Sequence, residues 1–393
     1  MPLTRQAPKM IRVIFFTASI FLTAFDVMGM NAVYVQSNEA ANNEVALLTQ
    51  ANQVAPLIYV ASYLTGGKGD RSIDGNQSHA LASDGKHLFA TNAGDDSISV
   101  FQIGRSGSLT LLTTTASRGR HPVSLAVIGD RLIVVNQGDV NPKSPINPNI
   151  QGFRILSTGA LVPLRGGYTY LPRDVPVDII GTSRSPIFSV VLSGTSEVDT
   201  FQLGLDGSMS RTGTFNAISN PLGGAIGRLN PYKLGVTLAD DSLPGVASLT
   251  FSRDGVPERV SQIVRPNLKD PCWATANASG TLLWTSAFET RTISLYWWGK
   301  NGEINSVSDF TPENYGPGGL DVTLSHNDRN LFWLRVGDPL DNQASIRPYI
   351  ITFEVNQSLL NISAGLRLIG KSWLPEKWGN SNATGLLSVR VKQ

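Results

Sequence analysis

Three residues that could move a proton recur at the start of a repeated strand pattern. His79 and Asp178 take the same place when the repeats are aligned on their second strand, and His121 lies two residues earlier in its own repeat. An offset of two residues keeps a side chain on the same side of a strand. A histidine beside a carboxylate can act as a general base near neutral pH. We therefore predict that His79, His121 and Asp178 are the catalytic residues of one site.

Charged residues in the neighbouring loops could hold a substrate, because arginine binds carboxylates and stabilises a developing oxyanion. In a four-stranded blade, the connection into the first strand and the hairpin between the second and third strands open on the same face, around a central funnel. The predicted substrate-binding residues at this mouth are Arg120, Arg173, Asp95, Asp139, Asp240 and Glu289. For each residue taken singly, the alternative is a solvated position in a turn rich in Asn, Asp and Gly.

The elements that must position these residues form an internal repeat. The phrase "HLFATNAGDDSISVFQIGRSGSLTLL", residues 87–112, returns about 44 residues later as "RLIVVNQGD" followed by "NIQGFRILSTGALVPL". Each unit reads as short apolar strands separated by Gly, Asn and Asp turns, which is typical of an all-β protein. The first-strand pattern occurs seven times; two of its copies are Val177–Ser183 and Leu320–His326.

The last copy, Thr384–Arg390, has no strand after it, whereas the chain after residue 30 begins with the second-strand pattern "AVYVQSN". Pairing these two segments would remove two free sheet edges at once. The sequence therefore predicts an all-β, seven-bladed β-propeller whose ring is closed by the C-terminal strand, which completes the N-terminal blade.

Composition excludes several classes of partner and site. The 393 residues carry a formal net charge of only +2, which gives no electrostatic case for a nucleic acid. The single cysteine, Cys272, excludes an intramolecular disulfide, and the four histidines have no close spacing typical of zinc sites. We expect no metal or other cofactor, a small-molecule ligand in the central funnel, and a monomer.

The first 29 residues differ from the rest of the chain. Arg5, Lys9 and Arg12 precede the apolar run Val13–Phe25, which is the layout of a secretory signal. This run is shorter than the roughly 20 residues that a membrane-spanning helix needs. We predict a signal peptide over residues 1–29, a single propeller domain over residues 30–393, no stable membrane span, and a secreted protein. Five glycosylation sequons would suit a secreted glycoprotein, although an Asn- and Ser-rich chain produces several by chance: Asn76, Asn277, Asn356, Asn361 and Asn382.

The phrases "ALASDGKHLFATNAGDDSISVFQIGRSGSL", "NIQGFRILSTGALVPL" and "VDTFQLGLDGSM" resemble the seven-bladed β-propeller lactonase family, which includes bacterial 6-phosphogluconolactonase and the fungal carboxymuconate cyclases. The resemblance extends from about Ala32 to the end of the chain. It implies lactone hydrolysis or muconate ring closure by a His at one first-strand entry, an Arg at another, and a Glu at the end of a second strand. The corresponding positions of this sequence are Val177 or Asp178, Leu222, and Leu192 or Ser193.

We therefore predict a secreted, lactonase-like propeller that acts on a small cyclic oxygenated metabolite in its central funnel, by lactone hydrolysis or ring-closing isomerisation. Because the implied His, Arg and Glu are not retained, the sequence leaves open whether the protein is an enzyme. One alternative is a catalytically inactive propeller that binds a ligand or a protein. The other is a secondary-metabolite cyclase that holds a reactive precursor in a ring-closing conformation.

Overall fold

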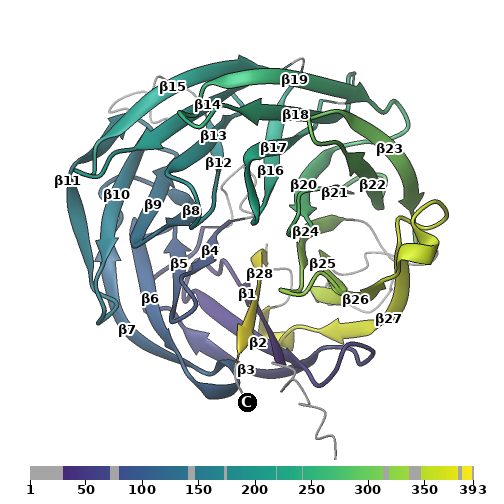
Figure 1. The fold of residues 1–393 in the computed structure, drawn as a ribbon. Coiled ribbons are helices and arrows are strands. Elements are labelled where there is room, and N and C mark those ends of the chain that lie inside the picture. Colours follow the sequence, from purple (N-terminus) through teal and green to yellow (C-terminus); the bar gives the residue numbers. More distant parts are fainter. Residues whose placement is uncertain are drawn as a thin grey trace, which may run out of the picture.

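The computed structural model describes residues 30–70, 79–139, 147–171, 175–217, 219–240, 242–312, 318–335, 347–378 and 383–391. In these residues, 28 strands form seven sheets of four strands each, and the sheets are arranged around one central axis (Figure 1). The predicted seven-bladed all-β propeller is confirmed. The predicted signal peptide and the sequons at Asn76 and Asn382 lie outside the described residues.

Four classes of strand follow one another from the axis to the perimeter of each blade (Figure 1). The innermost strands are β28 (Thr384–Val391), β4 (Leu81–Ser83), β8 (Pro122–Ile128), β12 (Pro176–Gly181), β16 (Pro221–Gly227), β20 (Pro271–Ala276) and β24 (Gly319–Leu324). The second strands are β1 (Met30–Gln36), β5 (His87–Asn92), β9 (Arg131–Asn136), β13 (Ile187–Leu192), β17 (Asn230–Leu238), β21 (Leu282–Ala287) and β25 (Asn330–Arg335). The third strands are β2 (Glu44–Gln50), β6 (Ser97–Ile103), β10 (Asn149–Ile155), β14 (Glu197–Leu203), β18 (Gly245–Phe251), β22 (Thr292–Trp298) and β26 (Tyr349–Val355). The outermost strands are β3 (Ile58–Leu64), β7 (Leu109–Ala116), β11 (Leu161–Tyr170), β15 (Met209–Asn216), β19 (Pro257–Val264), β23 (Ile304–Phe310) and β27 (Leu366–Trp373).

The two ends of the described chain meet in one blade. The C-terminal strand β28 pairs with β1 in antiparallel register, with Asn31 opposite Arg390 and Tyr34 opposite Leu387. In Figure 1 the yellow β28 accordingly lies beside the purple β1. The predicted closure of the ring by the C-terminal strand is confirmed, and it gives the inner edge of β1 a partner strand.

Helical structure in the described residues is limited to three short 3₁₀ turns: η1 (Arg105–Gly107), η2 (Gln357–Leu359) and η3 (Glu376–Trp378). Within the part of the chain that the structure describes, no helix is long and apolar enough to cross a membrane.

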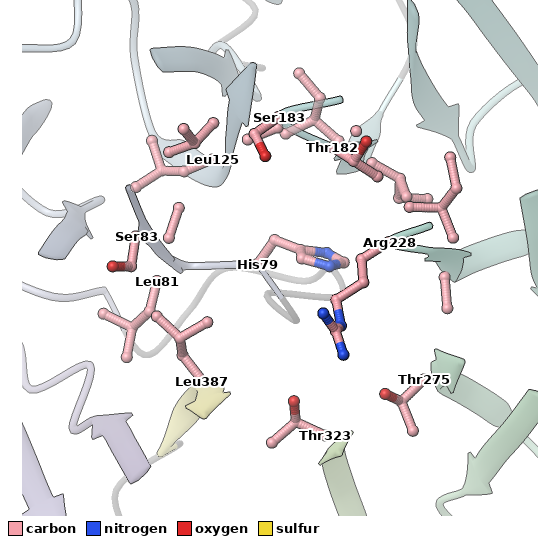
Figure 2. Close-up of a pocket in the computed structure, with 18 of the residues that line it drawn as sticks. His79, Leu81, Ser83, Leu125, Thr182, Ser183, Arg228, Thr275, Thr323 and Leu387 are labelled. Atoms are coloured by element: carbon pink, nitrogen blue, oxygen red, sulfur yellow. The ribbon is translucent and has the colours of Figure 1, made fainter. Parts of the chain in front are cut away.

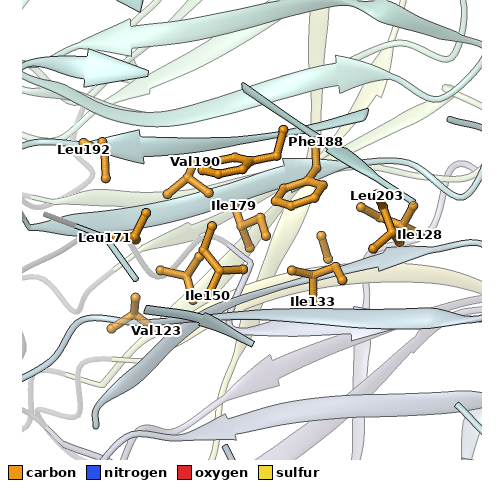
Figure 3. Close-up of a cluster of buried hydrophobic side chains, with 13 residues drawn as sticks. Val123, Ile128, Ile133, Ile150, Leu171, Ile179, Phe188, Val190, Leu192 and Leu203 are labelled. Atoms are coloured by element: carbon orange, nitrogen blue, oxygen red, sulfur yellow. The ribbon is translucent and has the colours of Figure 1, made fainter. Parts of the chain in front are cut away.

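Apolar side chains fill the space between neighbouring blades and hold the inner strands in place. Between the third and fourth blades, Ile133 and Ile150 pack against Ile179 and Val190, and all four are completely buried (Figure 3). Two aromatic rings of the fourth blade, Phe188 and Phe201, stack beside them. Because blades cover both faces of each sheet, strands such as β5 and β13 are buried along their whole length rather than on alternate residues.

Several inner strands begin with an irregular segment, and this affects which side chains point toward the central axis. Four of them begin with proline, which lacks an N–H and is therefore tolerated at the first position of a strand. The pairing register shifts between Pro176 and Asp178 in β12, and between Gly319 and Val322 in β24. Such β-bulges change the direction in which the side chains of a strand point. Asp178 and Asp321 lie within these two irregular segments.

Candidate functional site

A cavity of about 550 Å³ follows the central axis of the ring. His79 lies in the turn before β4, whereas Arg184, Arg228 and His326 follow the ends of inner strands, and all four line the cavity. The cavity therefore extends from the starts of the inner strands to their far ends. Figure 2 shows the His79 ring and the Arg228 side chain directed into this space.

A histidine on the wall of the cavity is paired with a buried carboxylate. Nδ1 of His79 and Oδ1 of Asp178 are 2.8 Å apart; Asp178 is completely buried, while 36% of the His79 side chain is exposed. An ionised carboxylate only accepts hydrogen bonds, so this contact places the proton of a neutral imidazole on Nδ1. Nε2 is then the ring nitrogen with a lone pair, and it can accept a proton from a group in the cavity.

Backbone and side-chain donors fix the carboxylate of Asp178. The hydroxyl of Ser124 donates to Oδ1 at 2.8 Å, and the N–H of Ile179 donates to the same oxygen at 3.0 Å. Ser124 is completely buried and its hydroxyl donates to the carboxylate rather than to an imidazole, so it is not arranged as a nucleophile. Its role is to orient Asp178, which in turn orients His79.

A second buried carboxylate, Asp321, differs from Asp178 in that it lines the cavity itself. Val322 donates its N–H to Oδ1 at 2.8 Å, and Leu386 of β28 donates its N–H to Oδ2 at 2.6 Å. Burial raises the pKa of Asp321 to about 7, against the lowering effect of these N–H donors and of His79. Burial acts to lower the pKa of His79, but the charge of Asp178, the hydrogen bond to it and the charge of Asp321 together raise that pKa above its ordinary value.

Three other predicted residues, His121, Arg120 and Asp139, form a separate cluster at the starts of the inner strands. Nδ1 of His121 donates to the carbonyl of Gly138 at 2.9 Å, and the His121 N–H donates to Asp96 at 2.9 Å. Arg120 pairs with the same Asp96 at 2.8 Å and lies 3.8 Å from Asp139. The entry to β8 thus meets the hairpin between β5 and β6, on the face where the repeat predicts them to meet. Neither His121 nor Arg120 lines the axial cavity.

Three further predicted residues, Asp95, Asp240 and Glu289, lie in the turns between the second and third strands of their blades. Asp95 accepts from the N–H of Lys68 and from the hydroxyl of Ser97, which holds a hairpin together. Asp240 lies at a turn in which hydrogen bonds from Ser242 hold its pKa below the ordinary value, and Glu289 is exposed in another turn. None of these three lines the axial cavity. Arg173 lies outside the described residues.

The strand register corrects one detail of the repeat alignment. Leu81 and Ile179 pair with residues that lie two positions before the ends of β5 and β13, namely Ala90 and Val190. Asp178 is therefore equivalent to Ala80, and His79 lies one residue earlier. By the same register, Ser124 and Asp321 occupy the position of Asp178 in their own blades.

Asp321 and Arg228 were missed by the sequence analysis. A signal for Asp321 was present, because aspartate is the second residue of both Val177–Ser183 and Leu320–His326. Arg228 follows the end of β16 and has no counterpart in the repeat pattern. The positions at which the family resemblance implies a His and a Glu are Val177 or Asp178, and Leu192 or Ser193. Val177 and Leu192 belong to the packing between blades, Asp178 pairs with His79, and Ser193 donates to the carbonyl of Val175.

The chemistry open to this site is proton transfer at the wall of a small cavity. His79 supplies a base and Asp178 holds it, while Arg228 supplies positive charge at the far end of the cavity, next to the carbonyl of His326. Among the described residues, no group of His, Cys, Asp and Glu side chains could hold a metal ion.

Comparisons with known proteins agree with this architecture. Residues 35–143 match a protein family described as lactonase, 7-bladed beta-propeller. A candidate 6-phosphogluconolactonase from Bacteroides uniformis superposes with a TM-score of 0.69 at 14% identity, covering 92% of this chain and 100% of that chain. The periplasmic gluconolactonase PpgL from Pseudomonas aeruginosa superposes with a TM-score of 0.62 at 12% identity, covering 92% and 99%. No curated protein matches the sequence. The predicted resemblance to seven-bladed lactonase propellers is confirmed, and at these identities the structural likeness concerns the fold.

Proposed function

Because the chain is a seven-bladed propeller of the lactonase type, we propose that it hydrolyses a lactone in its axial cavity. The observation that carries this proposal is the hydrogen bond from His79, which lines the cavity, to the completely buried Asp178. The structural relatives named above include a gluconolactonase, which supports a cyclic ester as the substrate class. We propose both the reaction and its location in the axial cavity.

The proposed reaction begins with a water molecule that attacks the carbonyl carbon of the lactone. Nε2 of His79 takes a proton from this water, and Asp178 stabilises the imidazolium that forms. Arg228 lies at the other end of the cavity, where it donates to the carbonyl of His326, and it can bind an anionic group of the substrate away from the reacting carbonyl. The ring C–O bond then breaks, the ring oxygen receives a proton, and the product is an open-chain hydroxy acid.

The cavity volume limits the size of the substrate. Ligand sites typically enclose about 300–1,000 Å³, and the axial cavity of about 550 Å³ lies within this range. Its half-buried wall mixes aliphatic residues with hydroxyl groups, for example Ile226 and Leu387 with Thr275 and Thr323. A small cyclic ester with both apolar and polar edges fits this wall.

A second candidate function is binding without catalysis, by a propeller that serves as a ligand-binding scaffold. The observation that favours it is that neither a His nor a Glu stands where the resemblance implies them: the residues there are Val177 or Asp178, and Leu192 or Ser193. Under this alternative, a lactone would raise the melting temperature by mass action and would not be consumed.

A panel of lactones, followed by release of acid, tests the two candidates. Under our proposal, at least one lactone is hydrolysed, and His79→Ala lowers kcat/KM by about 10²–10⁴-fold, the usual contribution of a general base. Asp206→Asn is the control, because Asp206 is an exposed turn residue whose carboxylate accepts from Ser208. Lactones that stabilise the protein without turnover would favour the scaffold; equal activity in His79→Ala would exclude this base.

We also propose that residues 1–29 direct secretion, with removal of the leader. The basic residues and the short apolar run described above support this proposal. N-terminal sequencing of the protein recovered from culture medium is the test. A protein that stays in the cells with Met1 in place would contradict it.

A further inference from the structure

Two buried carboxylates flank His79, and the proposed reaction uses only one of them. Asp178 and Asp321 occupy equivalent positions in the fourth and seventh blades, and each accepts a hydrogen bond from the N–H of the residue that follows it. They differ in their relation to His79. Asp178 is hydrogen-bonded to the ring, whereas Asp321 acts on it through its charge.

The surroundings of Asp321 favour a carboxyl group that holds a proton. Only 3% of the residue is exposed, and the charged side chains that influence it are His79 and Asp178. One of these is another carboxylate, and an ionised pair of carboxylates in a buried site is unfavourable. The groups that stabilise the negative charge of Asp321 are two backbone N–H donors and His79. A single proton placed on Asp321 or on Nε2 of His79 therefore relieves the repulsion.

We propose that Asp321 is the general acid of the lactone hydrolysis proposed above, an inference that rests on that function. As the ring C–O bond breaks, the carboxyl group of Asp321 gives its proton to the ring oxygen. His79 has by then taken a proton from the attacking water. Transfer of that proton from the His79 imidazolium to the Asp321 carboxylate restores both groups, so that one water is consumed and no other reactant is needed.

The electrostatics of the site agree with this division of roles. Burial keeps the pKa of Asp321 at about 7, high enough for the carboxyl group to carry a proton in neutral solution. Pairs of titratable groups with different environments are a recurring arrangement for acid and base in one site. Here the base is tied to Asp178, and the acid is tied to the backbone of β28 through Leu386.

The acid role predicts a dependence on the leaving group, which a purely structural role would not show. The probes are δ-valerolactone, which releases an alkoxide, and dihydrocoumarin, which releases a phenolate that leaves without prior protonation. With Asp321→Ser, we expect kcat/KM to fall by about 10²–10⁴-fold for the alkyl lactone and by less than about 10-fold for the aryl lactone. Serine stands at the equivalent position of the third blade, as Ser124, so the fold accommodates it. Equal losses for both substrates would overturn the assignment while leaving lactone hydrolysis intact.

A second measurement tests the inference even if neither lactone is hydrolysed. The titration of the His79 ring, followed by NMR in the wild type and in Asp321→Ser and Asp321→Asn, reports whether the two groups share a proton. Loss of the Asp321 charge should lower the apparent pKa of His79 by about one unit. An unchanged His79 titration in both variants would overturn the inference whatever the activity. Absence of turnover together with a shifted titration would instead count against the proposed function.

Discussion

Asp178 and His79 are 99 residues apart in the sequence and 2.8 Å apart at the axis of the ring. The contact joins the fourth blade to the turn that enters the second blade, and Ser124 of the third blade donates to the same carboxylate oxygen. Three successive blades thus contribute to one hydrogen-bonded group. Its geometry depends on the ring as a whole, because no single blade contains two of its members.

Asp178→Asn hardly changes the size of the side chain, but we expect it to lower the catalytic activity strongly. The amide can present its NH₂ group to Nδ1 of His79, which favours the wrong tautomer and leaves Nε2 without its lone pair. We expect kcat/KM for a hydrolysed lactone to fall by about 10²–10⁴-fold, as for other carboxylates that orient a catalytic histidine. Steady-state kinetics at several pH values measure this loss. Asp206→Asn, with the same chemical change at an exposed turn, should retain wild-type kinetics.

The activity should depend on pH in a bell-shaped manner. His79 must be neutral to accept a proton, so kcat/KM rises with pH as the ring loses its proton, and the raised pKa puts this midpoint above the ordinary value of 6.5. Asp321 must hold its proton to donate it, so activity falls as pH rises through its pKa of about 7. A pH–rate profile of Asp321→Ser should keep the rising limb and lose the falling one. A falling limb that persists in the variant would assign it to another group.

Asp321 should also make stability depend on pH. Its folded-state pKa, about 7, is above the ordinary value of 3.8, so the folded protein binds a proton that the unfolded chain releases between these values. Stability from this group therefore declines as pH rises from about 4 to about 7. The variant Asp321→Ser lacks this group, so its unfolding free energy should not show this decline. Between about pH 4 and pH 7, the wild type should therefore lose up to about 4 kcal/mol of unfolding free energy relative to the variant. Urea denaturation at pH 5 and pH 7.5 samples most of this change.

The closing strand should contribute strongly to stability through Leu386. Its side chain is nearly buried in the apolar cluster that joins β28 to the first and seventh blades. Leu386→Ala should lower the unfolding free energy by about 2–5 kcal/mol, the usual cost of a buried Leu-to-Ala change. Leu205→Ala is the matched control, since Leu205 is 99% exposed, and it should change stability by no more than about 0.5 kcal/mol. Similar effects of the two substitutions would contradict the packing of β28.

His121 and His79 should differ in their effect on turnover. The His121 ring is engaged by Gly138 and lies away from the axial cavity. We therefore expect His121→Ala to keep kcat/KM within about 10-fold of the wild type, below the usual contribution of a general base. Parallel kinetics of His79→Ala and His121→Ala decide between the two groups. A larger loss in His121→Ala would move the site to the cluster around Arg120 and Asp96.

The fold could be predicted from the sequence because the repeat is local. Each blade consists of strands that follow one another in the chain, and the orphan pattern at Thr384–Arg390 has an obvious partner near residue 32. Contacts across the axis could not be predicted from the sequence in this way. His79 and Asp178 could be assigned to one mouth by their parity, but their direct hydrogen bond depends on how the inner strands converge, which one-dimensional spacing does not encode.

There are physical reasons why Asp321 and Arg228 could not be predicted from the sequence. Asp321 lies in the irregular start of β24, where Gly319 and Val322 are the nearest paired residues, so simple alternation does not reveal its direction. Arg228 lies beyond the end of an inner strand and reaches the cavity with a long side chain. Conversely, Asp240 and Glu289 follow second-strand patterns as expected, yet their turns keep them away from the cavity lining.

The hydrogen bond from Leu386 to Asp321 links the acid of the site to the final strand of the chain. A polypeptide cut before residue 384 would leave the inner edge of β1 without its partner strand and would take away one of the two backbone donors to Asp321. Proteolytic nicking ahead of β28 would therefore open the ring and disturb the site together.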